Sequence, residues 1–377
     1  MASQGEFVLA KPLSLDGDFG FDCKAPNVLQ RILSLLKNVR PGSDLARFQV
    51  PPTFNAPKSQ LQWLGEPIYC TSKELLHECN NPKSSLDRFL AVVAWAMSSK
   101  VPVRFGVAPY NPILGETHHV SRGSLNVILE QVSHHPPVAC FHATDEEENI
   151  DITWCQHPVA KFCGTKVEVE VHGKRQLKLL NYGETYVIDT PKLLVKFLSL
   201  ENDWFGNVSI SCHETGLEAE LCYTSSSFLS RKGKHSIKGK IYDRTSQKTL
   251  YEIGGHWNGI VTVKDINNGK EMILYNAKEA IRGAKTPEIR DLQGLRQTES
   301  VVVWSKLSKS ILSKNWDEAS EAKRAVEGKQ REIAKARAIT GETWVPKHFH
   351  VSYSKENGWN GLPIENVVPP APIVVPL

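Results

Sequence analysis

Apolar and polar residues alternate along the middle of the chain, from Leu125 to about Ala280. The segment from Lys166 to Val171 alternates without a break, and turn-forming residues recur between such runs, for example at His172-Gly173 and Asn267-Asn268-Gly269. A period of two residues is typical of strands with one buried face, and connections this short predict antiparallel pairing. The pattern alone allows either a barrel that encloses a ligand or a β-sandwich with a packed core.

A helical period marks the two flanks of this region. Val28 to Val39 has one broad apolar face and stops at Pro41-Gly42, as expected of an amphipathic helix. Helices are also predicted over Ser72–Glu78, Ser85–Lys100, Val301–Leu312 and Trp316–Arg337. The second of these is apolar on nearly every side, which predicts burial.

Three stretches show no clear period. Residues 1–24 are predicted to form a loose leader, and Val50-Pro51-Pro52 is predicted to begin an extended connector. The proline-rich segment from Pro363 to Leu377 is predicted to be irregular.

The octet from Glu130 to Pro137 closes one alternating run and opens the next. Adjacent side chains on a regular strand point to opposite faces, so His134 and His135 could not address one ligand from undistorted β geometry. Each following proline favours an extended or polyproline conformation in the residue before it. Neighbouring side chains are then only about 120° apart, and we expect the two imidazoles to lean toward a common point.

This octet resembles the EQVSHHPP fingerprint of the oxysterol-binding-protein-related family of lipid transfer proteins. Two further family blocks recur in the same order, Tyr110–Thr117 (YNPILGET) and Glu327–Arg331 (EGKQR). The resemblance covers roughly residues 25–350. The chain is similar to the short plant form of the family, which consists of the ligand-binding domain alone.

The resemblance implies one lipid-binding domain over residues 1–377. Its fold class would be α+β, with mostly β structure. Its centre would be an incomplete, many-stranded antiparallel barrel around an apolar tunnel. The expected parts are the leader (1–24), an amphipathic lid (25–50), a helical and extended N-terminal subdomain (51–120), the barrel (121–285), a C-terminal helical subdomain (286–350) and a tail (351–377). The lid residues would be Val28, Leu29, Ile32, Leu33 and Leu36.

Composition limits the partners. A formal charge of +4 on 377 residues is far from the dense cationic patch that nucleic-acid binding needs, so we predict no nucleic-acid partner. It supports only weak attraction to anionic membranes. Eight dispersed cysteines without a CxxC pair indicate free thiols in a reducing compartment. With no secretory signal and no apolar run longer than Phe89–Met97, we expect a cytoplasmic monomer that contacts membranes peripherally.

The sequence predicts no enzyme, no metal and no cofactor. It contains no GxSxG, HExxH, phosphate-binding loop or dinucleotide fingerprint. Ser133 beside His134 is not a catalytic triad, because a triad is defined by spatial roles. His118, His119, His134 and His135 lack a cysteine or acidic residue at ligand spacing.

Anion binding fits the sequence better. Lys323, Glu327 and Arg331 recur every four residues and so share one helix face. Taken alone, they are typical of solvated ion pairs. The resemblance implies instead that they close over an inositol phosphate opposite His134 and His135, with Asn111 supplying an amide.

One position departs from the family pattern. Members that bind phosphatidylinositol 4-phosphate have lysine where Ala108 stands in Ala108-Pro109-Tyr110-Asn111-Pro112. A charge-assisted hydrogen bond contributes roughly 1.5 to 3 kcal/mol, so its loss predicts about ten- to hundredfold weaker headgroup binding. Arg104, His118 or His119 are the candidates to replace that charge.

The resemblance thus implies a non-enzymatic carrier of a sterol or similar lipid between membranes, exchanged against phosphatidylinositol 4-phosphate. The alternative is a lipid-sensing scaffold at membrane contact sites that binds its ligand without net transfer.

Overall fold

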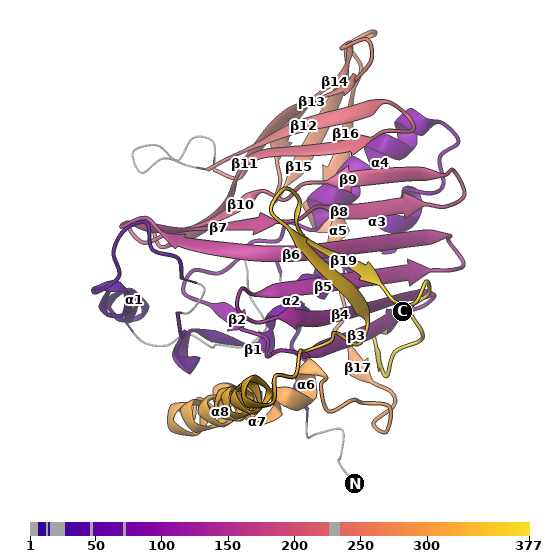
Figure 1. Ribbon diagram of the computed structural model, residues 1–377. Helices are drawn as coiled ribbons and strands as arrows, with labels where there is room; N and C mark the ends of the chain where they lie inside the picture. Colours follow the sequence, from indigo (N-terminus) through magenta and orange to yellow (C-terminus); the bar gives the residue numbers. More distant parts are fainter. Residues whose placement is uncertain (1–6, 13, 16–26, 46–47, 71–72, 226–233) are drawn as a thin grey trace.

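The computed structural model describes residues 7–12, 14–15, 27–45, 48–70, 73–225 and 234–377. Most of its described strands belong to one 16-stranded sheet. Its main path runs β16-β15-β14-β13-β12-β11-β10-β7-β6-β5-β4-β3-β20-β17, and β16 and β17 are not paired with each other. The sheet is therefore an incompletely closed barrel, as predicted (Figure 1).

The sheet is built mainly from consecutive hairpins. Its strands are β3 (Thr117–Arg122), β4 (Leu125–Ser133), β5 (Val138–Asp145), β6 (Ile150–Phe162), β7 (Lys166–His172), β8 (Arg175–Leu179), β9 (Glu184–Ile188), β10 (Lys192–Lys196), β11 (Glu201–Cys212), β12 (Leu217–Thr224), β13 (Ser236–Asp243), β14 (Thr249–His256), β15 (Ile260–Asp265), β16 (Glu271–Asn276), β17 (Glu288–Ile289) and β20 (Ile373–Val374). Its described ladders are antiparallel except that between β20 and β3, which is parallel.

Two smaller sheets and the helices complete the chain. β1 (Asn55–Ser59) pairs with β2 (Ala108–Tyr110), and β18 (Phe349–Ser354) pairs with β19 (Gly358–Pro363). The helices are α1 (Val28–Leu36), the 3₁₀ turn η2 (Pro52–Phe54), α2 (Gln60–Tyr69), α3 (Lys73–Glu78), α4 (Ser85–Ser98), α5 (Ala277–Ala280), α6 (Ser300–Val303), α7 (Ser305–Leu312) and α8 (Trp316–Thr340).

The inward faces of the strands form one apolar cluster. Alternate residues of the hairpins contribute to it, such as Ile150 and Ile152 of β6 and Leu217 and Ala219 of β12. Helix α4 is buried on nearly every side and packs into the same cluster, as its composition predicts. In Figure 1, α4 lies behind the sheet, next to β16.

Helix α2 replaces part of the predicted extended connector. It begins at a capping box in which Ser59 accepts from the Leu61 N–H and Gln62 accepts from the Ser59 N–H at 2.8 Å. Pro67 lies within the helix, and in the sequence it argues against a helix here because proline removes one helical hydrogen bond. Burial against β3 and β4 provides the stability that local propensity lacks.

The segment predicted as a tail, 351–377, contains regular structure, and the irregular structure predicted from Pro363 to Leu377 is wrong at β20. Residues 351–363 lie in the β18–β19 hairpin, which crosses the outer face of the barrel in Figure 1. Ile373 and Val374 then pair with β3, because the edge of β3 offers backbone groups that need partners.

The predicted loose leader is wrong for its described part. Phe7, Leu9 and Leu15 pack against the main apolar cluster, and the Lys11 carbonyl accepts a hydrogen bond from Lys58 Nζ at 2.9 Å. Burial of these apolar side chains holds a segment that has no regular structure. The other leader residues, 1–6, 13 and 16–24, lie outside the described part of the chain.

Candidate functional site

The YNPILGET block is joined by its backbone to the end of β4. The Gly115 N–H donates to the Gln131 carbonyl, and the Gln131 N–H donates to the Glu116 carbonyl, both at 2.9 Å. Gly115 has a φ of +79°, and a Cβ there would lie 2.5 Å from the Trp344 ring. Only glycine fits this backbone and this close approach.

His134 and His135 lie side by side in the turn between β4 and β5. Their ring centroids are 4.5 Å apart, which confirms the expected proximity. His134 Nδ1 is 3.0 Å from the Pro112 carbonyl oxygen, and His135 is exposed. The backbone forms a tight turn with a cis His135–Pro136 bond, not the predicted polyproline helix, because β4 and β5 are adjacent strands.

The protonation of His134 follows from its surroundings. Burial lowers the pKa of its imidazole, the neighbouring His135 lowers it further, and the Pro112 carbonyl raises it. Because a carbonyl only accepts, Nδ1 carries the proton in this contact. Nε2 is then the ring atom with a lone pair in the neutral form.

Lys323 is buried, whereas its spacing with Glu327 and Arg331 taken alone is typical of solvated ion pairs. It is 8 % exposed, and its Nζ donates to the Val50 carbonyl at 2.5 Å and to Asn55 Oδ1 at 2.9 Å. Burial lowers the pKa of the Lys323 ammonium, and Glu327 raises it. Glu327 lies 4.0 Å from Lys323 and 3.9 Å from the exposed Arg331, as the four-residue spacing predicts.

Asn55 connects the two halves of the candidate site. Its Nδ2 donates to the Ala108 and Pro109 carbonyls, both at 3.2 Å, while its Oδ1 accepts from Lys323. His134 contacts the same segment at Pro112. Lys323 and His134 therefore flank one stretch, Ala108–Pro112, in which Asn111 is exposed. No sequence signal indicated Asn55.

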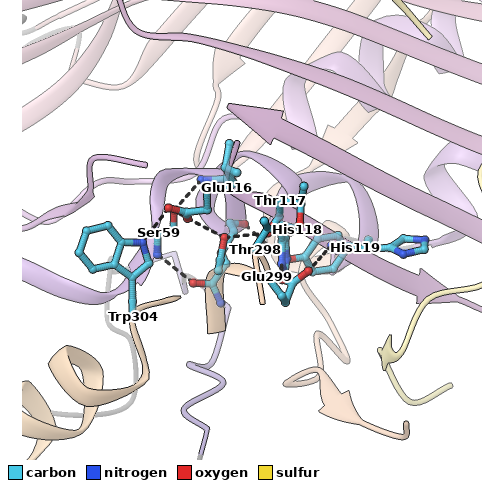
Figure 2. Close-up of polar contacts among 12 residues, drawn as sticks. Ser59, Glu116, Thr117, His118, His119, Thr298, Glu299 and Trp304 are labelled. Carbon is cyan, nitrogen blue, oxygen red and sulfur yellow. Dashed lines mark hydrogen bonds and ion pairs between the residues drawn. The ribbon is translucent and has the colours of Figure 1, made fainter. Parts of the chain in front are cut away.

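The buried carboxylate of Glu116 holds the YNPILGET block in place, and Figure 2 shows it between Ser59 and Trp304. Glu116 accepts hydrogen bonds from the Ile113 N–H at 3.0 Å, Trp304 Nε1 at 2.9 Å, Ser300 Oγ at 2.7 Å and Ser59 Oγ. Burial raises the pKa of the Glu116 carboxyl above its ordinary value, and the four donors limit that rise. Glu116 thus joins the block to β1 and to the start of the C-terminal helices.

His118 and His119 are structural. His118 contacts Glu299 Oε1 at 2.7 Å through Nδ1 and the Tyr69 hydroxyl at 3.0 Å through Nε2 (Figure 2). His119 Nε2 lies 2.8 Å from the Pro369 carbonyl oxygen. With their rings bound in this way, neither can replace the lysine missing at position 108. Within the described ranges, no three His, Cys, Asp or Glu residues form a group able to hold a metal ion.

Glu130, the first fingerprint residue, also has a structural role. Its carboxylate is fully buried and accepts from the backbone N–H groups of Lys347, at 2.9 and 3.1 Å, and His348, at 2.9 Å. Burial raises the pKa of this carboxyl, and the two N–H groups oppose the rise. The fingerprint therefore combines a turn that presents histidines with an anchor for the β18–β19 hairpin.

The predicted lid helix packs on the end of the sheet. Leu36 contacts Phe162 and Phe197, with Leu29 and Ile32 partly buried beside them. Leu33 points outward and is 50 % exposed. The side chain of Val28 and residues 25, 26, 46 and 47 of the predicted lid lie outside the described residues. In Figure 1, α1 stands beside the end of β7.

The segment after α1 holds this helix to β6. The Gly42 N–H donates to the Phe162 carbonyl at 2.6 Å, the Phe162 N–H donates to the Ser43 carbonyl at 3.1 Å, and the Leu45 N–H donates to the Ala160 carbonyl at 2.8 Å.

None of the described helices has both the length and the apolar character required to cross a membrane.

Comparison with known proteins agrees with the fingerprint. Residues 31–311 match the family model described as oxysterol-binding protein. The chain belongs to this family. Oxysterol-binding protein-related protein 4C of Arabidopsis thaliana is 49 % identical over 98 % of the chain and 99 % of its own length. Protein 4B of the same plant is 50 % identical over 98 % of the chain and 97 % of its own length.

Solved structures share the fold of this family member. The Osh1 ORD domain in complex with cholesterol superposes with a TM-score of 0.76 at 24 % identity, covering 96 % of this chain and 91 % of that one. The Osh3 ORD of Saccharomyces cerevisiae in complex with PI(4)P superposes with a TM-score of 0.69 at 22 % identity, covering 93 % and 94 %.

Proposed function

We propose that this protein binds a sterol or similar lipid inside its barrel and carries it between membranes without catalysis. The incompletely closed sheet with apolar inward-facing residues supports this most directly, because a large barrel of this kind can surround an apolar ligand. Family membership and the cholesterol complex of a protein with the same fold agree with it.

The energetics of such a ligand require a closed interior. A sterol that buries about 500 Å² of apolar surface gains roughly 12 kcal/mol before ordering costs, so it crosses water slowly without a carrier. Helix α1 is the proposed lid, since it attaches through Leu36 and leaves Leu33 outward. Leu33 would then meet the membrane interface when the protein docks.

The headgroup site is proposed around Ala108–Pro112. His134, His135, Asn111, Lys323 and Arg331 would bind the inositol phosphate of phosphatidylinositol 4-phosphate, in exchange for the sterol. Glu327 would hold the two cations in position or accept from an inositol hydroxyl. The bonds that place Lys323 and His134 on one segment support this assignment, as does the PI(4)P complex of the Osh3 domain. Arg331 grips phosphate bidentately, whereas Lys323 acts as a point charge.

We further propose a cytoplasmic monomer that contacts membranes peripherally and transiently.

A transfer assay between vesicles tests the carrier function. Dehydroergosterol should move from donor to acceptor vesicles faster with the protein than without it. Phosphatidylinositol 4-phosphate in the acceptor vesicles should accelerate that movement and should itself return to the donor.

Each result has a defined meaning. No sterol movement by folded protein contradicts the carrier function, and an unchanged rate with phosphatidylinositol 4-phosphate contradicts exchange. A lipid that stays bound through purification and does not exchange within seconds would favour the lipid-sensing scaffold.

A further inference from the structure

The barrel wall divides into two ladders between β6 and β11. The first part of β6 pairs with β8, and its second part pairs with β7. β11 likewise pairs with β10 near its start and with β9 near its end. Arg175, the first residue of β8, lies at this division, directly opposite Trp154 of β6.

Two cations are buried at this division. Arg175 is 4 % exposed and Lys100, just beyond the end of α4, is 7 % exposed. Arg175 Nη2 donates to Ser99 Oγ at 3.1 Å, and its guanidinium carbon lies 4.5 Å from the centre of the Trp95 ring. Lys100 Nζ lies 5.7 Å from the centre of the Trp204 ring.

Neither cation has an acidic partner. Within the described residues, no carboxylate oxygen lies within 4.0 Å of Lys100 or Arg175. Two other buried cations differ: Lys58 pairs with Glu66 and Arg88 pairs with Glu184, each at 2.5 Å.

The pKa values of both cations are lowered, as expected for buried charges without an acidic partner. Burial lowers the pKa of Arg175 to about 10, and the charge of Tyr223 opposes that shift. Burial lowers the pKa of Lys100 well below its ordinary range, and the Arg175 charge adds to that shift.

An unpartnered amide lies on the same face. Gln156 follows Trp154 by two residues, and residues two apart on a strand share a face. Its side chain is 2 % exposed, and neither Nε2 nor Oε1 has a hydrogen-bond partner. Both a donor and an acceptor are therefore available on the strand face that Trp154 shares with its partner Arg175.

A buried charge without a counterion is strongly unfavourable, and a cation–π contact offsets only part of that cost. An anion between the two cations would remove that cost, and Arg175 presents a fork that suits carboxylate or phosphate oxygens. The surrounding tryptophans and the adjacent apolar cluster suit a hydrocarbon chain. Free phosphate has no hydrocarbon chain and would make no favourable apolar contact with the tryptophans or the cluster.

We propose that Lys100, Arg175 and Gln156 bind the anionic headgroup of a single-chain lipid, a carboxylate or a phosphate monoester, inside the barrel. This site is separate from the one at His134 and His135. It rests on the proposed function in one respect, namely that the barrel interior admits lipid.

Equilibrium binding to delipidated full-length protein tests this. At pH 7.4, oleate should bind at least tenfold more tightly than oleyl alcohol, which has the same chain without the charge. K100M and R175M should each reduce that preference by about tenfold. K264M, which removes an exposed lysine of β15, should leave it unchanged.

Three further arms make the outcome decisive. Oleoyl lysophosphatidate identifies a phosphate headgroup if it displaces oleate, and displacement by millimolar inorganic phosphate would show a free-anion site and overturn the lipid proposal. Thermal unfolding reports whether each variant is folded. If R175M does not fold, K100M still tests the proposal, because methionine in place of a buried cation without an acidic partner should not destabilise the protein.

Equal affinity for oleate and oleyl alcohol, or an unchanged preference in folded K100M, overturns the proposal. Sterol transfer measured in parallel separates this failure from failure of the proposed function. Oleate preference without sterol transfer would refute the carrier and keep the anion site, and binding of no lipid at all would refute both.

Discussion

At the scale of single residues, one backbone carbonyl prepares His134 for a ligand. The contact with Pro112 holds the proton on Nδ1, while burial and His135 lower the pKa of the ring. The neutral ring can accept from an inositol hydroxyl through Nε2, and the protonated ring can donate to phosphate. Each form suits a different part of the same headgroup.

Replacing both histidines should separate the two proposed ligands. H134A/H135A should abolish phosphatidylinositol 4-phosphate extraction from vesicles and leave dehydroergosterol binding within about twofold, because the rings lie in a turn outside the main apolar cluster. Extraction and equilibrium sterol binding measure this. An equal loss of both activities would mean that the turn is structural.

Restoring the family lysine should strengthen headgroup binding. A108K adds one charge-assisted hydrogen bond, so phosphatidylinositol 4-phosphate should bind about ten- to a hundredfold more tightly. A108M, with similar length and no charge, is the control for bulk. Unchanged affinity in A108K would show that another cation already fills this role, and since His118 and His119 are bound elsewhere, Arg104 would be the candidate.

At the scale of elements, attachment of α1 depends on a few apolar contacts. Among the described side chains of the helix, Leu36 is the buried one, in a cluster with Phe162 and Phe197. The described backbone bonds to β6 begin only after the helix ends. The proposed opening of the helix would therefore break these apolar contacts and leave the backbone bonds of Gly42–Leu45 in place. This arrangement is suited to a lid.

A charged residue at position 36 should open the proposed lid. Burying a charge in an apolar cluster is unfavourable, so L36D should release bound dehydroergosterol several-fold faster than wild type. L33D changes an exposed position of the same helix and should leave the release rate in solution unchanged. Deleting residues 1–40 should match L36D. Equal release rates in L36D and L33D would contradict a lid anchored at Leu36.

At the scale of the whole molecule, the closing segments of the chain join the barrel through buried polar groups. Glu130 accepts from the backbone before β18, and His119 contacts the backbone before β20. The pKa of both His119 and His348 is lowered to about 4, mainly by burial and in part by the charge of Arg296, while the Pro369 carbonyl opposes the shift of His119. Both histidines are therefore neutral in the folded protein at pH 6.

This predicts a loss of stability in acid. The unfolded chain binds these protons near pH 6.5 and the folded protein only near pH 4, so the free energy of unfolding should fall as pH drops through that interval. His119 should account for up to about 3 kcal/mol, and the partly exposed His348 for less because solvent screens it.

Urea unfolding at pH 7 and pH 4.5 measures this loss. H119Q keeps an amide donor but does not titrate, so the difference between the two pH values should shrink. The same difference in H119Q and in wild type would show that other groups control acid unfolding.

Local pattern predicted the parts of this protein that depend on local physics. Alternation at Lys166–Val171 predicted a strand because side chains on a pleated backbone alternate between faces. The four-residue spacing of Lys323, Glu327 and Arg331 predicted a shared helix face for the same kind of reason. The octet and the YNPILGET block identified the family.

Only the tertiary structure decided which distant residues meet. Asn55 beside Lys323, Glu130 beneath β18 and the two unpaired cations at the end of α4 and the start of β8 join segments far apart in the chain. Helix α2 and strand β20 likewise depend on neighbours that local propensity does not include. Such contacts follow from the path of the folded backbone, because a buried polar group bonds to whatever the fold brings within reach.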